Sequence, residues 1–122
     1  MVSSKPRIIE KPWGQEEIWG DIPGKCTGKF IQINPGQRLS RQYHEKKDES
    51  ICVLEGCLRL EIGEDPDGNP SSVYIAGPGF SYDIPAGTIH RFCSQDNNLV
   101  RLVEVSTYYP NDVIRLCDDY KR

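Results

Sequence analysis

The sequence predicts an all-β domain, a sandwich or barrel of short strands followed by a short C-terminal helix. Apolar runs of about five to seven residues recur along the chain and are separated by turn residues. Eleven glycines and nine prolines mark these turns. The chain of 122 residues is long enough to bury a core, and no internal repeat or linker divides it. We therefore expect residues 1–122 to form a single domain.

The expected strands follow an N-terminal arm, residues 1–10. They are KFIQI (29–33), the segment 40–45, SICVL (50–54), CLRLEI (57–62), SSVYIA (71–76), FSYDI (80–84), IHRFC (89–93) and LVRLVEV (99–105). The runs on either side of Glu55 and Gly56 predict a tight β-hairpin that turns at these two residues.

The C-terminal stretch, residues 111–122, has a different pattern. Asp112 stands where a helix N-cap is expected. Val113, Leu116 and Cys117 recur at helical spacing. This stretch is therefore expected to form a helical tail.

Composition excludes several classes of function. Hydrophobic residues make up 37% of the chain, charged residues 27%, and the net charge of −3 comes from interleaved acids and bases. Without a basic stripe, nucleic acid is not an expected partner. The chain has no apolar stretch of membrane-spanning length and no signal-like start. Five cysteines without a CxxC pair indicate small, reduced, mostly buried residues of a cytoplasmic protein.

A first group of polar residues is expected to point into the core. In an extended strand, Gln42 and His44 project from the same face. Glu49 opens the next strand with the same parity as Ile51 and Val53, which must face the core. An unpaired carboxylate among apolar residues is costly, and a cation is the natural compensation.

His90 extends this group from a second place in the sequence. It begins a strand on the same face as Phe92, so it points inward if Phe92 belongs to the core. Two histidines, a glutamate and a glutamine suit Zn²⁺, Fe²⁺, Mn²⁺, Ni²⁺ or Co²⁺ better than a soft thiolate metal. Each histidine by itself also fits a hydrogen-bonded structural role, and spacing alone does not separate the two interpretations.

Two stretches resemble the two motifs of the cupin superfamily. GQRLSRQYHEKKDESICVLEG (36–56) has the glycine, first ligand, histidine, glutamate and closing glycine of the first motif in register. GFSYDIPAGTIHRFCS (79–94) matches the glycines, proline and histidine of the second. The departures are Gln42, where most cupins have a histidine, and Ser94, where asparagine is usual. The resemblance implies a jelly-roll fold.

Further stretches resemble the stand-alone cupin domain of type II mannose-6-phosphate isomerases. They are KPWGQEEIW (11–19), PGQRLSRQYH (35–44), AGTIHR (86–91) and the tail NDVIRLCDDYKR (111–122). The likeness covers roughly residues 11–122. A glycine-rich nucleotide-binding motif is missing, so we expect no guanylyltransferase activity. Lys47 stands where these enzymes usually carry an arginine.

The resemblance implies a metal-dependent sugar or sugar-phosphate isomerase-like cupin. Such an enzyme interconverts an aldose and a ketose through an enediol, in the manner of mannose-6-phosphate isomerase. The implied ligands of one divalent transition metal (Zn, Mn, Fe, Co or Ni) are Gln42, His44, Glu49 and His90. A small sugar or sugar phosphate is the implied partner, and a homodimer is expected because dimers are common among cupins.

Three further residues are candidates for catalysis. Lys47 would bind an oxyanion or a substrate anion, although a solvated turn lysine is an equally good interpretation. Glu104 and Tyr82 have inward parity and would serve as proton-transfer groups, or else as structural hydrogen-bonding residues. Two alternatives to the isomerase remain. One is a non-catalytic metal- and sugar-binding module, and the other is a different cupin enzyme such as an epimerase or dioxygenase.

Overall fold

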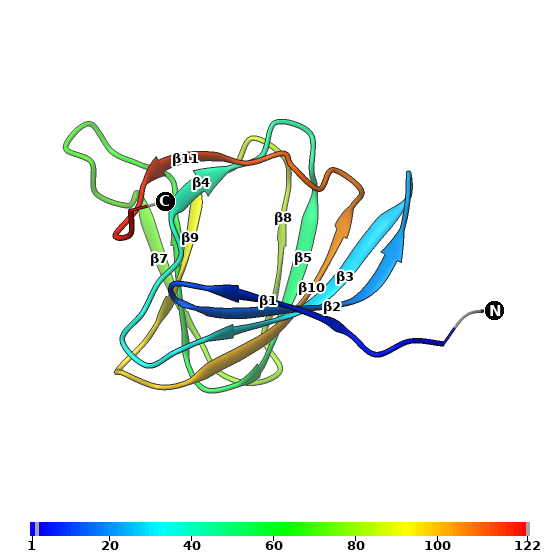
Figure 1. Cartoon of the computed structure of the whole chain (residues 1–122). Coiled ribbons are helices and arrows are strands. Elements are labelled where there is room, and N and C mark those ends of the chain that lie inside the picture. Colours follow the sequence, from blue (N-terminus) through cyan, green and yellow to red (C-terminus); the bar gives the residue numbers. More distant parts are fainter. Residues whose placement is uncertain (2, 122) are drawn as a thin grey trace.

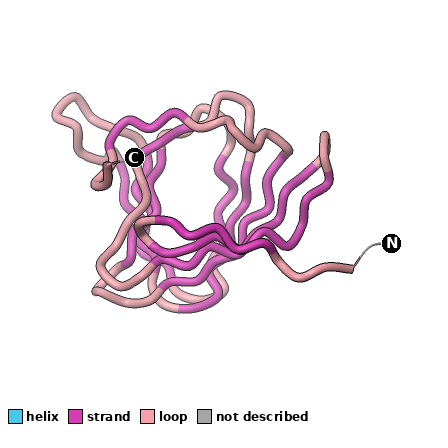
Figure 2. The backbone as a smooth tube through the Cα atoms, viewed as in Figure 1, coloured by secondary structure: helices cyan, strands magenta, loops and turns pink. Residues whose placement is uncertain are grey.

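Two antiparallel β-sheets face each other and enclose the interior of a β-barrel in the computed structural model, which describes residue 1 and residues 3–121 (Figure 1). Within this part of the chain, every regular element is a strand (Figure 2). The predicted all-β jelly-roll class is therefore confirmed. None of the described residues forms a helix long and apolar enough to cross a membrane.

The two sheets contain six and five strands. In spatial order, the six-stranded sheet consists of β1 (Arg7–Lys11), β2 (Gly14–Ile22), β3 (Cys26–Ile33), β10 (Val100–Thr107), β5 (Glu49–Glu55) and β8 (Ser81–Ile84). The five-stranded sheet consists of β11 (Ile114–Cys117), β4 (Arg41–Tyr43), β9 (His90–Ser94), β6 (Leu58–Ile62) and β7 (Ser72–Ala76). Strand β1 begins within the stretch that the sequence suggested as an N-terminal arm, and β2 follows it in a region where no strand was predicted.

Strand β10 sets the register of the six-stranded sheet, because it pairs with β3 on one side and β5 on the other. Glu104 of β10 lies opposite Lys29 of β3 and Ile51 of β5. Two residues further along the same faces, the three strands carry buried apolar side chains. Charged groups therefore lie on the barrel wall immediately next to the apolar core.

The core fills the space between the sheets with side chains from both. Its buried members are Trp13, Ile31, Ile33, Leu39, Ile51, Val53, Leu58, Leu60, Ala76, Ile84, Phe92, Val100 and Leu102. Alternation along the strands explains this set, since residues two apart share a face of the sheet. The core gives the strands that carry the polar residues a fixed register.

The predicted C-terminal helix is wrong. Ile114 to Cys117 form β11, which pairs antiparallel with β4. A helix this short is marginal by itself, and β-branched side chains such as Ile114 favour the extended conformation. Pairing with the open edge of β4 therefore outweighs the local helical spacing. Asp112, expected as a helix N-cap, instead binds the backbone of the turn after β4.

The predicted hairpin at Glu55 and Gly56 is also wrong. Strand β5 belongs to the six-stranded sheet, whereas β6 belongs to the five-stranded sheet. The link between them is thus a corner from one sheet to the other. Gly56 makes this corner with φ of 81°, and its Cα lies against the backbone of Leu99.

Arginines are buried on the face of the five-stranded sheet that points away from the core. Arg91, only 2% exposed, donates to the carbonyl of Leu39 at 2.8 Å and lies 3.6 Å from the carboxylate of Asp119. Arg41 donates to the carbonyl of Gly68 at 2.6 Å. The C-terminal segment and the loop that contains Gly68 therefore bind these guanidinium groups.

The five cysteines are all free, but the expectation that most are buried is wrong. Only Cys93 is buried, whereas Cys117 is exposed and the other three are partly exposed. Burial and the nearby charge of Glu61 raise the pKa of the Cys93 thiol to about 12. This thiol is therefore unreactive at neutral pH.

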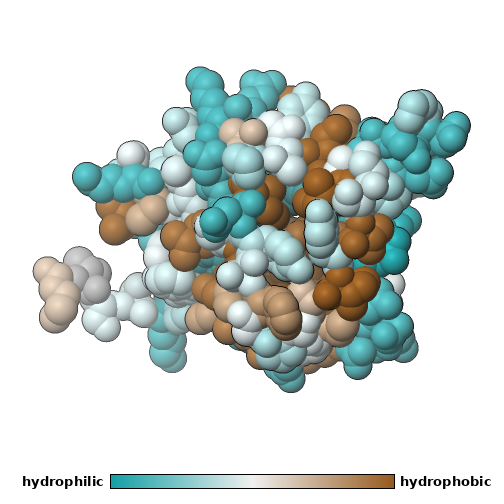
Figure 3. Space-filling view, turned by 180° about the vertical axis from the view of Figure 1, so that it is seen from behind, coloured by the Kyte–Doolittle hydropathy of each residue, from teal (hydrophilic) through white to brown (hydrophobic). Residues whose placement is uncertain are grey.

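Some large apolar side chains remain on the surface. Figure 3 shows brown apolar residues grouped near the middle of one face, with hydrophilic residues around them. Val73, Tyr74 and Ile75 of β7 are each at least 40% exposed, and β7 is the last strand of its sheet. This edge carries no charged side chain to block strand pairing.

Candidate metal centre

Three potential metal ligands meet inside the barrel from three separate segments. His44 directly follows β4, Glu49 is the first residue of β5, and His90 is the first residue of β9. One ligand atom from each lies within 4.8 Å of the other two. Pairing between β4 and β9, which puts Gln42 opposite His90, brings the two histidine segments together. All three side chains are buried.

The ligand atoms face one another without hydrogen-bond partners. His90 Nε2 lies 3.0 Å from Glu49 Oε1, and His44 Nε2 lies 3.7 Å from Glu49 Oε2. Both Nε2 atoms and Glu49 Oε1 are buried and make no hydrogen bond. Unsatisfied buried polar atoms are rare, because each costs about 1–3 kcal/mol. Three of them that converge indicate a site for a cation.

Hydrogen bonds on the far side of each imidazole explain why the Nε2 atoms are available. His44 Nδ1 lies 2.5 Å from the carbonyl oxygen of Asp112, and His90 Nδ1 lies 2.8 Å from that of Thr88. A carbonyl only accepts, so each Nδ1 carries the proton. In the neutral rings, each Nε2 therefore presents a lone pair to the carboxylate of Glu49. This tautomer is the one needed for metal binding through Nε2.

A proton is a poor substitute for a metal ion at His44. Burial and the charge of Lys47 lower the pKa of His44, which disfavours the imidazolium form. Burial by itself raises the pKa of Glu49, but the positive charge of Lys47 counters this effect. The net pKa of Glu49 lies below its usual value. The centre therefore combines a carboxylate with neutral imidazole, as a divalent metal requires.

Gln42 lies next to this group and shares its cavity with His44. Its amide oxygen accepts a hydrogen bond of 2.8 Å from the hydroxyl of Ser40. The strand parity deduced from the sequence thus places Gln42 and His44 on the same cavity wall. Its ligand role stays a prediction.

The turn after β4 is held by one carboxylate. Asp112 accepts hydrogen bonds from the backbone N–H groups of Glu45, Lys46 and Lys47 at 2.8–2.9 Å. The N–H groups of Glu45 and Lys46 contribute most to a pKa of Asp112 below its usual value. Since the carbonyl of Asp112 also binds His44, one residue contacts both a ligand and the turn that follows it.

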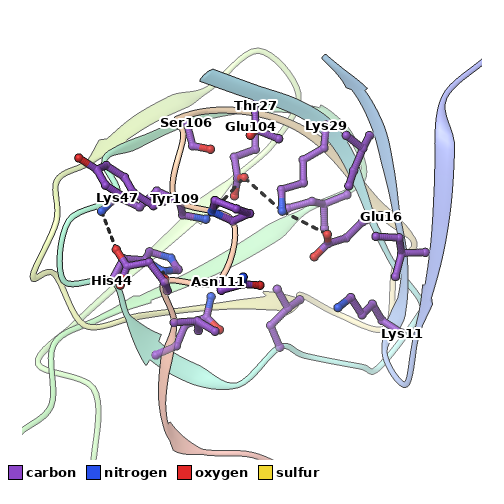
Figure 4. A pocket seen from close by; sticks show the side chains of 18 of the residues that line it. Lys11, Glu16, Thr27, Lys29, His44, Lys47, Glu104, Ser106, Tyr109 and Asn111 are labelled. Carbon is purple, nitrogen blue, oxygen red and sulfur yellow. Dashed lines mark hydrogen bonds and ion pairs between the residues drawn. The ribbon is translucent and has the colours of Figure 1, made fainter. Parts of the chain in front are cut away.

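A cavity of about 460 Å³ lies beside the metal-ligand group and is lined by His44, Gln42 and Lys47. This volume is within the range of small-molecule sites. Its polar lining includes Arg7, Lys11, Glu16, Thr27, Lys29, Gln42, His44, Lys47, Glu104, Ser106, Asn111, Asp112 and Arg115. Figure 4 shows many of these side chains pointing toward a common space.

Alternating charges run along one wall of the cavity. Lys29 Nζ lies 3.1 Å from Glu16 and 3.6 Å from Glu104, and Figure 4 shows it between the two. Lys47 Nζ lies 3.9 Å from Glu104 and 3.4 Å from Glu49. The chain of charges therefore leads from Glu16 to the metal-ligand group. Each lysine neutralises two carboxylates that burial would otherwise penalise.

Among the titratable groups of the cavity, Glu104 is the best suited to transfer a proton. Burial and the negative charge of Glu49 raise its pKa to about 7, although Lys29 and Lys47 lower it in part. A carboxyl group with this pKa exchanges a proton readily near neutral pH. Its buried Oε2 atom makes no hydrogen bond.

The structure brings together two of the three residues predicted to be catalytic. Lys47 and Glu104 both line the cavity. Tyr82 does not belong to this lining. Its ring packs against Tyr74 with 5.9 Å between the ring centres, next to the apolar core.

Sequence reasoning missed Lys29, Glu16 and the contacts of Asp112. The signal for Lys29 was present, because it shares strand parity with the buried Ile31. Glu16 and Asp112 carried no comparable signal. Their positions depend on a strand that was not predicted and on the tail that was predicted as a helix.

Comparison with known proteins gives a consistent picture. A family model described as a cupin domain matches residues 29–106. Mannose-1-phosphate guanylyltransferase of Escherichia coli is 29% identical over 119 residues, which are 95% of this chain and 23% of that protein. Alginate biosynthesis protein AlgA of Pseudomonas aeruginosa is 26% identical over 117 residues, 93% of this chain and 23% of its own length. The chain thus spans about a quarter of these relatives.

Solved structures share the fold at low identity. The capsular polysaccharide assembling protein CapF from Staphylococcus aureus superposes with a TM-score of 0.78, 17% identity and coverage of 93% of this chain and 35% of that one. A sugar phosphate isomerase of the cupin superfamily from Silicibacter pomeroyi has a TM-score of 0.67 and 24% identity, over 84% of this chain and 64% of that one. The motifs, the jelly roll and the family match agree, and the chain belongs to the cupin family.

Proposed function

We propose that the protein is a metal-dependent sugar-phosphate isomerase-like cupin. One observation carries this proposal: the Nε2 atoms of His44 and His90 and the Oε1 atom of Glu49 converge without hydrogen-bond partners, and His44 also lines a polar cavity. Nitrogen and oxygen donors of this kind fit Zn²⁺, Mn²⁺, Fe²⁺, Co²⁺ or Ni²⁺. Gln42 is the fourth proposed ligand. When bound, such an ion polarises the carbonyl and the neighbouring hydroxyl of a sugar.

The chain's own residues would then move a proton between adjacent carbons. Glu104 is the proposed proton-transfer group, because it is buried on the cavity wall and its pKa is about 7. Lys47 Nζ, next to both Glu104 and Glu49, is the proposed partner of the negative charge that develops on an enediol. Tyr82 has no comparable support, since it does not belong to the cavity lining.

A sugar phosphate is the ligand class that best fits the cavity. The lining carries Arg7, Lys11 and Arg115 in addition to the two ion-paired lysines. Cations of this kind bind phosphate. The Silicibacter pomeroyi neighbour described as a sugar phosphate isomerase supports the same class at the level of the fold. A homodimer stays a prediction, for which the apolar edge of β7 is the candidate surface.

The metal-loaded protein should interconvert an aldose phosphate and its ketose, mannose 6-phosphate being the first to test. In deuterated water, deuterium should enter the carbon that receives the proton, because the proton-transfer group exchanges with solvent. If the side chain at position 47 binds the enediolate oxygens, Lys47→Arg should raise kcat severalfold, because a guanidinium group can bind two oxygens at once. Rates by coupled assay and deuterium content by NMR provide the measurements.

A charge-removing variant supplies the control for this experiment. Lys47→Met should lower kcat by about a hundredfold. Absence of turnover and of deuterium exchange over a broad panel of sugar phosphates, in protein that binds metal, would contradict the isomerase. Exchange without net isomerisation would instead indicate an epimerase-like reaction.

Glu49 should make the stability of the protein depend on metal. Removal of the metal leaves a buried carboxylate facing two imidazole lone pairs, and this arrangement is costly. A chelator should therefore lower the melting temperature of the wild type clearly more than that of Glu49→Gln. Differential scanning calorimetry with and without chelator measures both shifts. Equal shifts in the two proteins would rule out Glu49 as a ligand.

A non-catalytic metal- and sugar-binding module is the second candidate. It is favoured by the ion pairs of Lys47, which already engage this lysine with Glu49 and Glu104. A lysine held in this way is less free to follow charge as it develops on a substrate. Saturable sugar-phosphate binding by calorimetry, without turnover or exchange, is the result that this alternative predicts.

A further inference from the structure

Asp112 joins the cavity wall to the metal-ligand turn. It lies in the segment 108–113, which connects β10 to β11 and lines the cavity along its whole length. This segment is distant in sequence from His44, yet it supplies the acceptor for His44 Nδ1. The position of His44, a proposed metal ligand, therefore depends on the position of the segment that contains Asp112.

The side chain of Asp112 fixes the turn through three backbone donors. Its Oδ1 accepts from Glu45 N at 2.9 Å, and its Oδ2 accepts from Lys46 N at 2.8 Å and Lys47 N at 2.9 Å. Consecutive N–H groups that point at one anion form a compact binding site for it. The turn has no strand partner over these residues, so this carboxylate takes the place of a sheet ladder.

The backbone of Asp112 completes the arrangement. Because its carbonyl oxygen accepts the Nδ1 proton of His44, it selects the tautomer that presents Nε2 to Glu49. Side chain and backbone act together, since the three bonds of the carboxylate hold this carbonyl against the imidazole. Lys47, at the other end of the same turn, is positioned toward Glu49 by the same contacts.

We propose that Asp112 is a positioning residue for the metal centre, which sets the tautomer and orientation of His44 from the segment between β10 and β11. The inference rests on the metal site of the proposed function. It goes beyond that site because neither the ligands nor their motif includes this residue. Hydrogen-bond partners of this kind typically change metal affinity by about 10- to 100-fold.

The test uses Co²⁺ as the probe for wild type, Asp112→Asn and Asp119→Asn. The asparagine amide keeps one acceptor oxygen but sets an NH₂ group against backbone N–H donors. Asp119 is the matched control, because it is a carboxylate of the same C-terminal region that binds Arg38 at 2.6 Å and does not line the cavity. Asp112→Asn should weaken Co²⁺ binding about tenfold or more and shift its visible absorption spectrum. Asp119→Asn should retain wild-type affinity and spectrum.

The imidazole tautomer gives a second readout that is independent of metal. The chain has two histidines, so nitrogen NMR of the metal-free protein resolves His44 directly, with His90→Ala to assign it. Wild type should show His44 protonated at Nδ1, whereas Asp112→Asn should show a mixture with the Nε2–H form. If Asp112→Asn does not fold, Asp112→Glu replaces it, because it keeps the charge and displaces the carboxylate by one methylene.

The outcomes separate this inference from the proposed function. Wild-type Co²⁺ affinity, spectrum and tautomer in the Asp112 variant would overturn the positioning role while leaving the metal site intact. An equal loss of affinity in the Asp112 and Asp119 variants would also overturn it, since general loosening of the C-terminal segment would then suffice. Failure of wild type itself to bind Co²⁺ would remove the proposed metal centre and this inference with it.

Discussion

Replacement of both His44 and His90 by alanine should abolish tight binding of divalent transition metals. The double variant retains Glu49 from the convergent group, and one carboxylate by itself binds such ions weakly in water. We expect affinity to fall by at least about a thousandfold, because most of the metal-binding free energy comes from the lost imidazoles. Zn²⁺ or Co²⁺ titration by calorimetry, on protein purified without a nickel column, measures the change.

A cysteine variant controls for adventitious binding. Cys117 is the exposed thiol, and Cys117→Ser should bind metal like the wild type. Circular dichroism must show that the double histidine variant keeps its β-structure. Equal metal occupancy in wild type and the double histidine variant would disprove the proposed ligand set.

Gly56→Ala should be strongly destabilising. A Cβ at this position would lie 2.0 Å from the carbonyl oxygen of Leu99 and 3.1 Å from Cα of Val100. The backbone also has φ of 81°, where a non-glycine residue is strained by about 1–2 kcal/mol. Because the neighbours are backbone atoms, the corner must move as a whole. We expect a loss of about 4 kcal/mol or more in the free energy of unfolding.

Gly79→Ala separates strain from collision in this measurement. Gly79 has φ of 90°, but nothing lies within 4 Å of a Cβ placed there. Its alanine variant should therefore lose only the conformational cost, about 1–2 kcal/mol. Urea unfolding of both variants gives the two free energies. Similar losses would show that the backbone of Leu99 yields easily and that close packing at the corner matters little.

Local patterns in the sequence were enough to predict the strands that form most of the barrel. Glycine and proline separate apolar runs of strand length, and strand parity alone placed His44, Glu49 and His90 on the inner side. Parity is a local property, so it survives into the folded protein wherever the neighbouring core residues are correctly assigned. The candidate metal ligands His44, Glu49 and His90 are therefore the part of the site that sequence could predict.

Partners distant in the sequence account for the failures. The helical spacing at Leu116 and Cys117 is a local pattern, but the edge of β4 that captures β11 lies far away along the chain. The apolar runs around Gly56 look like a hairpin, and nothing in them says that β5 and β6 join different sheets. Asp112 was correctly predicted to bind backbone N–H groups through its carboxylate. The prediction placed these groups in a C-terminal helix, whereas they belong to the turn after β4.

The central place of β10 constrains the order in which this protein can be built. Among the described strands, β1, β2 and β3 form one hydrogen-bonded block and β5 with β8 another, and only β10 joins them. During synthesis, both blocks expose an unpaired edge until residues 100–107 have left the ribosome. Pairing of this long-range kind makes folding slow and leaves nascent chains open to aggregation. The proposed metal ligands are all synthesised before β10. The cavity wall beside them is therefore complete only after β10, which carries Glu104, has paired with its neighbours.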